Sequence, residues 1–303
     1  MVDSATPKID LQRLVCGAQL PALPQSAIHL LELSKDPDNG PAEFAVPIEA
    51  DAGLTGQVLR FVNSSYFGFS REISSVKLAI TLVGVRTIKN FALWSAVFSL
   101  MPDPKCGPFA LKRLWQDSLR RAMFARKVAK LLGVKEVEEP FAAALLQDMG
   151  VPLLAKEAPR LYIRLLEARE EGRVRLSDLE HRVFGWNHAD AAGMMARGWN
   201  LPEAFAGLIE AHAQIERWIE EREPGKAAVA LSAMLPSTAD PLWHESSQFV
   251  DYWQQLAPPT APSVTAILGE VDAEFAEFAP VLKVATPEKT LVERLEAMAA
   301  VTP

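Results

Sequence analysis

Cysteine is nearly absent from this sequence, which has two cysteines, Cys16 and Cys106, among 303 residues. Two thiols are too few for a disulfide scaffold or a zinc knuckle. The opening stretch MVDSATPKID has neither the basic start nor the apolar core of a signal peptide. The longest apolar run, FALWSAVFSLM at 91–101, is too short to cross a bilayer. We therefore expect a cytoplasmic protein with reduced thiols and no membrane partner.

The chain also lacks an excess of positive charge, since its net charge is -7 at pH 7. Sequence-independent binding of nucleic acid depends on neutralising phosphates, so we do not expect a nucleic-acid partner. One local basic cluster does occur, and clusters of this kind usually form the solvated face of a helix. Its members are Arg120, Arg121, Arg126, Lys127 and Lys130.

Strand signals are scarce. The sequence shows little two-residue alternation and no Asn-Gly or Asp-Gly turn between β-branched runs. Apolar residues recur instead at helical spacing along most of the chain. These patterns predict an all-α protein. Its N-terminal helical bundle subdomain, residues 1–105, should pack on a second helical subdomain, residues 106–235.

DPKCGP at 103–108, rich in proline and glycine, marks the expected boundary between the two subdomains, and APPTAP at 257–262 is a linker signal further on. A C-terminal extension over residues 236–303 follows the second subdomain. It should contain a loop and two amphipathic helices, near 264–279 and 287–301. The pair Thr286-Pro287 predicts the start of the second of these helices.

The common enzyme signatures are missing. No glycine-rich phosphate loop, dinucleotide-binding pattern or Gly-x-Ser-x-Gly elbow occurs in the sequence. The chemistry-bearing candidates are instead polar residues within apolar helices. Asp148 lies in FAAALLQDMGVPLL, and a buried carboxylate needs a cation, a metal or hydrogen-bond donors. His188 and His212 lie in two further apolar helices and could join Asp148 as metal ligands, or all three could be structural.

Several stretches in one order resemble the HDOD family, the HD-related output domain of bacterial signalling proteins. The similarity covers about residues 18–235. Its main segments are LPALPQSAIHLLELSKDPD, VLRFVNSSYFG, EISSVKLAITLVG, LWQDSLRRAMFARKVAK, FAAALLQDMGVPLL and WNHADAAGMMARGWNLPEAFAGLIEAH. The resemblance implies that the second subdomain is HD-like, similar to metal-dependent phosphohydrolases. In catalytic HD enzymes a His, a His-Asp pair and a distal Asp hold one or two metal ions that activate water.

The sequence departs from that pattern at two ligand positions. Asp117 stands where the first histidine is expected, and Gln147 stands where the histidine of the His-Asp pair is expected. Three candidate ligands remain, Asp148, His188 and His212. Asp117 would be a fourth if it points inward, although an exposed pair with Arg121 one turn later is the favoured alternative. We predict that Asp148 is buried and accepts hydrogen bonds from His188, His212, Gln147 or the backbone.

These departures favour a non-catalytic signalling output or scaffold module that binds an unidentified partner protein or a small effector. The alternative is a metal-dependent phosphohydrolase, acting on a cyclic dinucleotide or another phosphoester, with the altered ligand set Asp117, Asp148, His188 and His212. No cofactor is required by the first reading, and a weakly held Mn²⁺, Mg²⁺ or Fe²⁺ is the candidate under the second. Oligomerisation and the role of the extension stay open.

Overall fold

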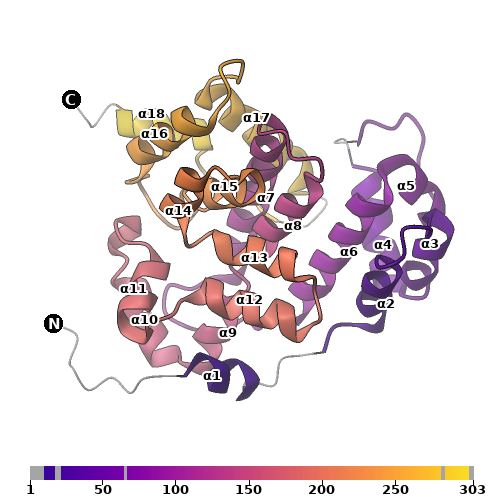
Figure 1. Ribbon diagram of the computed structural model, residues 1–303, viewed down its shortest axis with the longest axis horizontal. Coiled ribbons are helices and arrows are strands. Elements are labelled where there is room, and N and C mark those ends of the chain that lie inside the picture. Colours follow the sequence, from indigo (N-terminus) through magenta and orange to yellow (C-terminus); the bar gives the residue numbers. More distant parts are fainter. Residues whose placement is uncertain (1–9, 18–21, 65–66, 281–283, 300–303) are drawn as a thin grey trace.

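The computed structural model describes residues 10–17, 22–64, 67–280 and 284–299, and within these ranges it contains helices and no strand. The predicted all-α class is confirmed. The first subdomain is a bundle of short helices at one end of the molecule, shown in indigo and purple at the right of Figure 1. Its helices are α2 (Gln25–Leu33), α3 (Pro41–Glu49), α4 (Ala52–Val62), α5 (Val76–Val83) and α6 (Val85–Leu100).

The helix α1 (Leu11–Gly17) lies apart from this bundle and contacts α12, a helix of the second predicted subdomain. This second subdomain, called the HD-like part after the resemblance of its sequence, forms the centre of the molecule. Its first helices are α7 (Leu111–Leu131), α8 (Glu138–Leu146), α9 (Gly150–Glu157), α10 (Pro159–Glu167) and the short 3₁₀ helix η2 (Glu170–Gly172). The others are α11 (Leu176–Phe184), α12 (His188–Gly198), α13 (Glu203–Ala211), α14 (Ile215–Glu221) and α15 (Pro224–Ser232). The subdomain boundaries at 105 and 235 stay a prediction.

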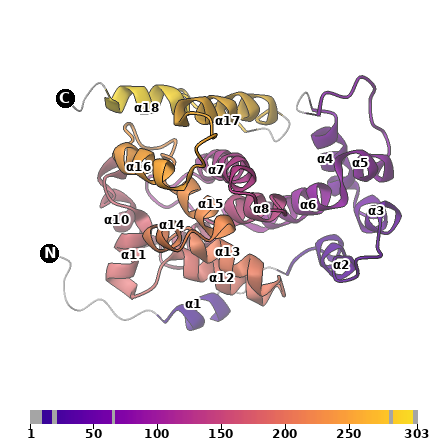
Figure 2. The same cartoon turned by 45° about the horizontal axis from the view of Figure 1, so that its top comes forward.

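Three helices form the C-terminal part, α16 (Ser246–Leu256), α17 (Val264–Phe278) and α18 (Leu291–Ala299). Figure 2 shows α17 lying along α7. The expected start of the last helix at Thr286-Pro287 is wrong. Thr290 and Glu293 bond reciprocally, each side chain accepting from the other's backbone N–H, so α18 starts after Thr290. The end of the predicted helix, at residues 300–301, lies outside the described residues.

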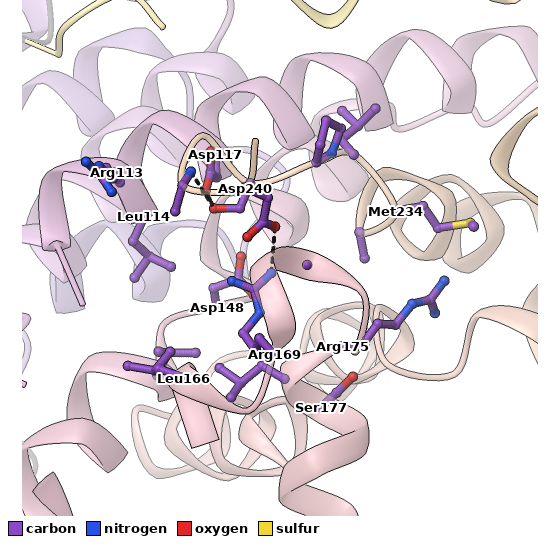
Figure 3. Close-up of a pocket in the computed structure, with 18 of the residues that line it drawn as sticks. Arg113, Leu114, Asp117, Asp148, Leu166, Arg169, Arg175, Ser177, Met234 and Asp240 are labelled. Atoms are coloured by element: carbon purple, nitrogen blue, oxygen red, sulfur yellow. Dashed lines mark hydrogen bonds and ion pairs between the residues drawn. The ribbon is translucent and has the colours of Figure 1, made fainter. Parts of the chain in front are cut away.

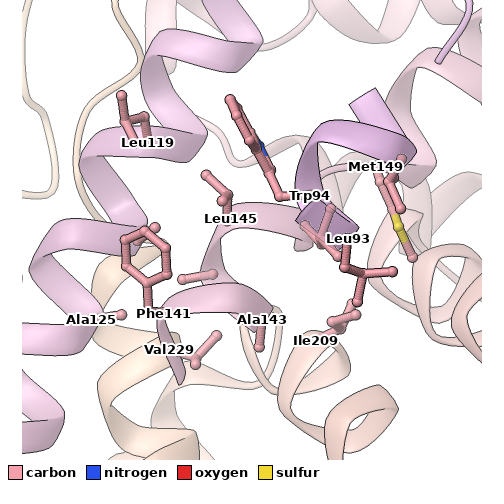
Figure 4. Close-up of a cluster of buried hydrophobic side chains, with 14 of the residues drawn as sticks. Leu93, Trp94, Leu119, Ala125, Phe141, Ala143, Leu145, Met149, Ile209 and Val229 are labelled. Carbon is pink, nitrogen blue, oxygen red and sulfur yellow. The ribbon is translucent and has the colours of Figure 1, made fainter. Parts of the chain in front are cut away.

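The main core lies where α6, α7, α8, α13 and α15 meet. Figure 4 shows apolar side chains from these helices interlocking, among them Trp94, Phe141 and Val229. The bundle adds α2 to α5 on the outer side of α6, which also contacts α8. Because α6 contacts both the helices of the bundle and α8, it connects the bundle to the HD-like part. A truncation such as Leu145→Ala in this core would cost about 2–5 kcal/mol.

The basic cluster of α7 is largely covered, with Lys130 as its exposed member. Arg120 is 2% exposed, and Arg126 pairs with Glu274 on α17. Lys127 also reaches α17, with its Nζ 3.1 Å from Glu270 and 3.3 Å from Glu274. The prediction failed because the acidic residues that cover these side chains lie about 145 positions later, which helix-surface spacing does not reveal.

No helix among the described residues is long and apolar enough to cross a membrane. Cys106 is a free thiol, buried, with its Sγ 3.3 Å from the carbonyl oxygen of Pro159. The side chain of Cys16 lies outside the described residues.

Candidate functional site

A cleft of about 400 Å³ opens in the HD-like part. Its walls come from α7, from the segment between α10 and α11, and from the segment that follows α15 (Figure 3). Most of its lining is apolar, and Asp117, Asp148, His188 and His212 are among its polar side chains. A concave, largely apolar cavity with a few converging polar groups is the usual form of a small-ligand site.

Asp148 is buried, as predicted, but it lies in the turn between α8 and α9 and not within a helix. Its Oδ2 forms an ion pair with Arg121 on α7, which supplies the cation expected for a buried carboxylate, although the sequence did not indicate which arginine would do so. Burial works against the negative charge, but the Arg121 guanidinium and a hydrogen bond from His188 hold the pKa of this carboxyl well below its usual range. Asp148 is therefore a carboxylate at any ordinary pH.

His188 is the first residue of α12, and it is held from behind by Glu180 on α11. Its ring Nδ1 is 2.6 Å from Glu180 Oε2, and its backbone N–H donates to the same oxygen at 2.7 Å. Its Nε2 is 3.4 Å from Asp148 Oδ1. Burial opposes a charge on this ring, but the two carboxylates outweigh burial and raise the pKa of His188 to about 10.

His212 follows the last turn of α13. Its Nδ1 is 2.6 Å from the carbonyl oxygen of Ile209, to which it donates, and its Nε2 is 3.0 Å from His188 Nε2. Burial and the positive charge of His188 lower the pKa of His212 to about 4. The ring is therefore neutral near pH 7, and its Nε2 lone pair faces the other two groups.

These three side chains fit the geometry of a single metal ion. Two ligand atoms about 2.1 Å from one ion, at angles from octahedral to tetrahedral, lie roughly 3.0–3.4 Å apart. The Nε2 atoms of His188 and His212 are 3.0 Å apart and His188 Nε2 is 3.4 Å from Asp148 Oδ1, both within this range, whereas His212 Nε2 is 3.9 Å from Asp148 Oδ1 and would have to move closer on binding. Both rings also donate their Nδ1 protons to oxygens, as metal-bound imidazoles do. Two imidazoles and a carboxylate suit Mn²⁺, Fe²⁺ or Zn²⁺.

Asp117 does not form the exposed pair with Arg121 that the helix spacing favoured. It is 5% exposed, and its carboxylate accepts from Ser237 Oγ at 2.6 Å and from the backbone N–H of Thr238 at 2.8 Å. Burial raises the pKa of Asp117, and Arg121 offsets part of that effect. The residue points inward, but its oxygens are engaged by the segment after α15, so it is not grouped with the other three candidate ligands.

Gln147 is fully buried at the end of α8. Neither its amide nitrogen nor its amide oxygen has a hydrogen-bond partner in the described part of the chain. It does not join Asp148, His188 and His212 in the group that could hold a metal. An amide is also a weaker metal ligand than imidazole. Position and chemistry therefore both indicate that Gln147 does not replace the expected histidine as a ligand.

A second set of ion pairs borders the cleft. Arg169 donates to Asp240 at 2.7 Å, and Figure 3 shows this pair beside Asp148. Arg175 pairs with Glu245 in the same way. Each pair ties the segment between α10 and α11 to the segment after α15. Sequence reasoning missed these residues, together with Arg121 and Glu180, because their partners lie far away along the chain or carry no local signal.

Residues 20–215 match the HDOD domain family. The chain belongs to the HDOD family. Within this family-matching region lie Asp117, Gln147, Asp148, His188 and His212, whereas α15 to α18 lie beyond it. The site described above is therefore built largely from the HDOD domain, and the wall formed by the segment after α15 lies beyond the matched residues.

Individual relatives agree with this assignment. An uncharacterized protein of Treponema pallidum is 26% identical over 220 residues, which cover 71% of this chain and 42% of its own length. A Shewanella amazonensis protein provisionally named a phosphohydrolase has a TM-score of 0.64 and 19% identity, covering 96% of this chain and 99% of its own. A Marinobacter aquaeolei protein provisionally named a signal transduction protein has a TM-score of 0.62 and 18% identity, covering 98% and 63%. The two structures show the fold alone, and the chain spans less than half of the curated relative.

Proposed function

We propose that this HDOD protein is a signalling output module that binds a partner protein or a small effector in the cleft and does not hydrolyse a phosphoester. The observation that carries the proposal is the buried ion pair between Arg121 and Asp148 Oδ2. A carboxylate that bridges two metal ions usually gives one oxygen to each. Because the guanidinium holds Oδ2, Asp148 is not free to bridge two ions in this way.

The remaining ligand positions support the same proposal. Asp117 is engaged by Ser237 and Thr238, and Gln147 lies outside the converging group. Loss of two imidazoles from the ligand set expected of a catalytic relative removes much of the metal affinity that hydrolysis needs. What remains is a three-residue set that can hold one ion.

The cleft itself favours a binding role. Its volume of about 400 Å³ lies within the range of small-ligand sites, and its lining is mainly apolar. The provisional name of the Marinobacter aquaeolei relative supports a place in signal transduction. A protein segment or an effector that fills this cleft would contact the segment between α10 and α11 and the segment after α15, whose mutual position the ion pairs fix.

A phosphohydrolase with an altered ligand set is the second candidate. It is favoured by the convergence of Asp148, His188 and His212 beside an open cleft and by the provisional name of the Shewanella amazonensis relative. In that case the three side chains would hold a divalent ion, which would supply Lewis acidity toward a phosphoester.

One assay separates the two candidates. The protein is dialysed against Mn²⁺ or Fe²⁺ and incubated with cyclic dinucleotides and with p-nitrophenyl phosphoesters, beside the variant Asp148→Ala. We expect no turnover by the wild-type protein above that of the variant. Turnover that requires Asp148 would overturn the proposal and establish the hydrolase.

A further inference from the structure

Glu180 is the most completely buried acid beside the candidate ligands, with 0% of its surface exposed. Both of its oxygens are used. Oε2 accepts from the backbone N–H and the ring Nδ1 of His188, and Oε1 accepts from the hydroxyl of Tyr162 on α10. A buried carboxylate persists only when donors satisfy it, so this residue is held in one orientation.

The local fold explains how Glu180 reaches His188. The helix α11 ends at Gly185, whose φ of 81° lies in the left-handed region that glycine adopts freely. The chain then turns, and Asn187 caps the start of α12. This turn places Glu180 behind the first residue of α12, where a helix has unsatisfied N–H groups and favours a negative charge.

The contact fixes which nitrogen of His188 faces the cleft. With Nδ1 donating to Glu180, the other ring nitrogen, Nε2, must point toward Asp148 and His212. A carboxylate behind an imidazole both orients the ring and makes its free nitrogen a better donor to a metal. Without Glu180 the ring could rotate or change tautomer, and one of the three ligand atoms would leave the group.

We propose that Glu180 is a positioning residue which, supported by Tyr162, sets the affinity of the Asp148, His188 and His212 group for a divalent metal ion. The inference goes beyond the proposed function. It concerns metal affinity alone and holds whether or not the protein hydrolyses any phosphoester.

The test uses Co²⁺, whose visible absorption reports on its ligands. The 303-residue chain is freed of metal and titrated with Co²⁺, beside Glu180→Gln, Tyr162→Phe and Asp148→Ala. We expect a wild-type absorption band that Asp148→Ala abolishes. Loss of the carboxylate that hydrogen-bonds the far nitrogen of a metal-bound histidine typically weakens metal binding about 10–100-fold. Glu180→Gln should therefore raise the dissociation constant for Co²⁺ by that factor. Tyr162→Phe should raise it less, because Glu180 keeps both contacts to His188.

Two controls separate positioning from general loss of stability. Glu203→Gln makes the same chemical change at an acid that pairs with Arg197 outside the cleft, and should leave Co²⁺ affinity unchanged. Val58→Ala destabilises the bundle at a fully buried position of α4 and should also leave the affinity unchanged. The proposal is overturned if the wild-type protein gives no band that depends on Asp148. It is equally overturned if Glu180→Gln binds Co²⁺ as tightly as the wild-type protein.

Discussion

Arg121 and Asp148 form an ion pair across the floor of the cleft, with side-chain exposures of 14% and 8%. The pair joins α7 to the turn between α8 and α9. It leaves Asp148 Oδ1 facing His188 and His212, so the two oxygens of one carboxylate have different partners. A cation supplied by the chain itself therefore neutralises the acid that the sequence placed inside an apolar helix.

Removing Arg121 should destabilise the protein strongly. Arg121→Gln leaves Asp148 buried with its main counter-charge missing, and breaking a buried pair in this way typically costs about 3–5 kcal/mol. Urea unfolding of metal-free protein measures the loss. Arg113→Gln, an exposed arginine of the same helix that also lines the cleft, should change the free energy of unfolding by less than about 0.5 kcal/mol. Equal effects of the two substitutions would contradict the assignment.

Gly150 should tolerate no side chain. A Cβ built on it would lie 2.5 Å from the carbonyl oxygen of His188, so α9 and the start of α12 approach each other only because this residue is glycine. Gly150→Ala should push His188 away from Asp148 and destabilise the fold by about 1–3 kcal/mol. It should also weaken Co²⁺ binding. Gly207→Ala, where a Cβ meets nothing within 4 Å, is the matched control and should be neutral or stabilising.

The two histidines predict a specific pH dependence for metal-free protein. Unfolded His212 takes up a proton as the pH falls below 6.5, whereas folded His212 resists protonation until about pH 4. Stability should therefore fall across this window, by at most about 1.4 kcal/mol per pH unit. His188 acts oppositely, because its folded pKa is about 10. Its contribution is complete below pH 6.5 and is lost as the pH rises toward 10.

Urea unfolding between pH 4.5 and 9.5, in the presence of a chelator, tests both windows. His212→Asn should make the acid side of the stability profile shallower than in the wild-type protein. An unchanged acid slope would show that this ring is already charged in the folded state.

The contact between α7 and α17 should depend more on Glu274 than on Glu270. Glu274 is 7% exposed at its side chain and pairs with Arg126 and Lys127, whereas Glu270 is 58% exposed and pairs with Lys127 alone. Glu274→Gln should lower the free energy of unfolding by about 1–3 kcal/mol, because Arg126 loses its shorter ion pair and keeps a weaker, 3.8 Å pair with Glu138 on α8. Glu270→Gln should lower it by less than about 1 kcal/mol. Reversal of this order in urea unfolding would disprove the packing of α17.

Local patterns in the sequence were sufficient to predict the helical fold class. Apolar spacing of 3.6 residues is a property of each segment and survives tertiary packing. Helix starts were less certain, since Thr286-Pro287 and Thr290 with Glu293 both carry start signals and only packing selects between them. In the structure Asp272 on α17 accepts from the first N–H groups of α18, which favours the later start.

The site was only partly predictable for a related reason. Asp148, His188 and His212 stood out because each is a polar residue within an apolar stretch of the sequence. Arg121 and Glu180 carried no such signal. Arg121 lies one turn after Asp117, so helix spacing paired it with the wrong acid, while Glu180 resembles any charged residue of an amphipathic helix. Their roles follow from contacts between helices, which no local pattern contains.

The number of metal ions per chain tests the account most directly. Metal-free protein is dialysed to equilibrium against Mn²⁺ and analysed for metal and protein content, with Asp148→Ala as the reference. A site with three ligand residues and Arg121 on Asp148 Oδ2 predicts one Mn²⁺ per wild-type chain and none per Asp148→Ala chain. Two ions per wild-type chain would show that Asp148 bridges a binuclear centre and would contradict the account, and so would a wild-type value equal to that of the variant.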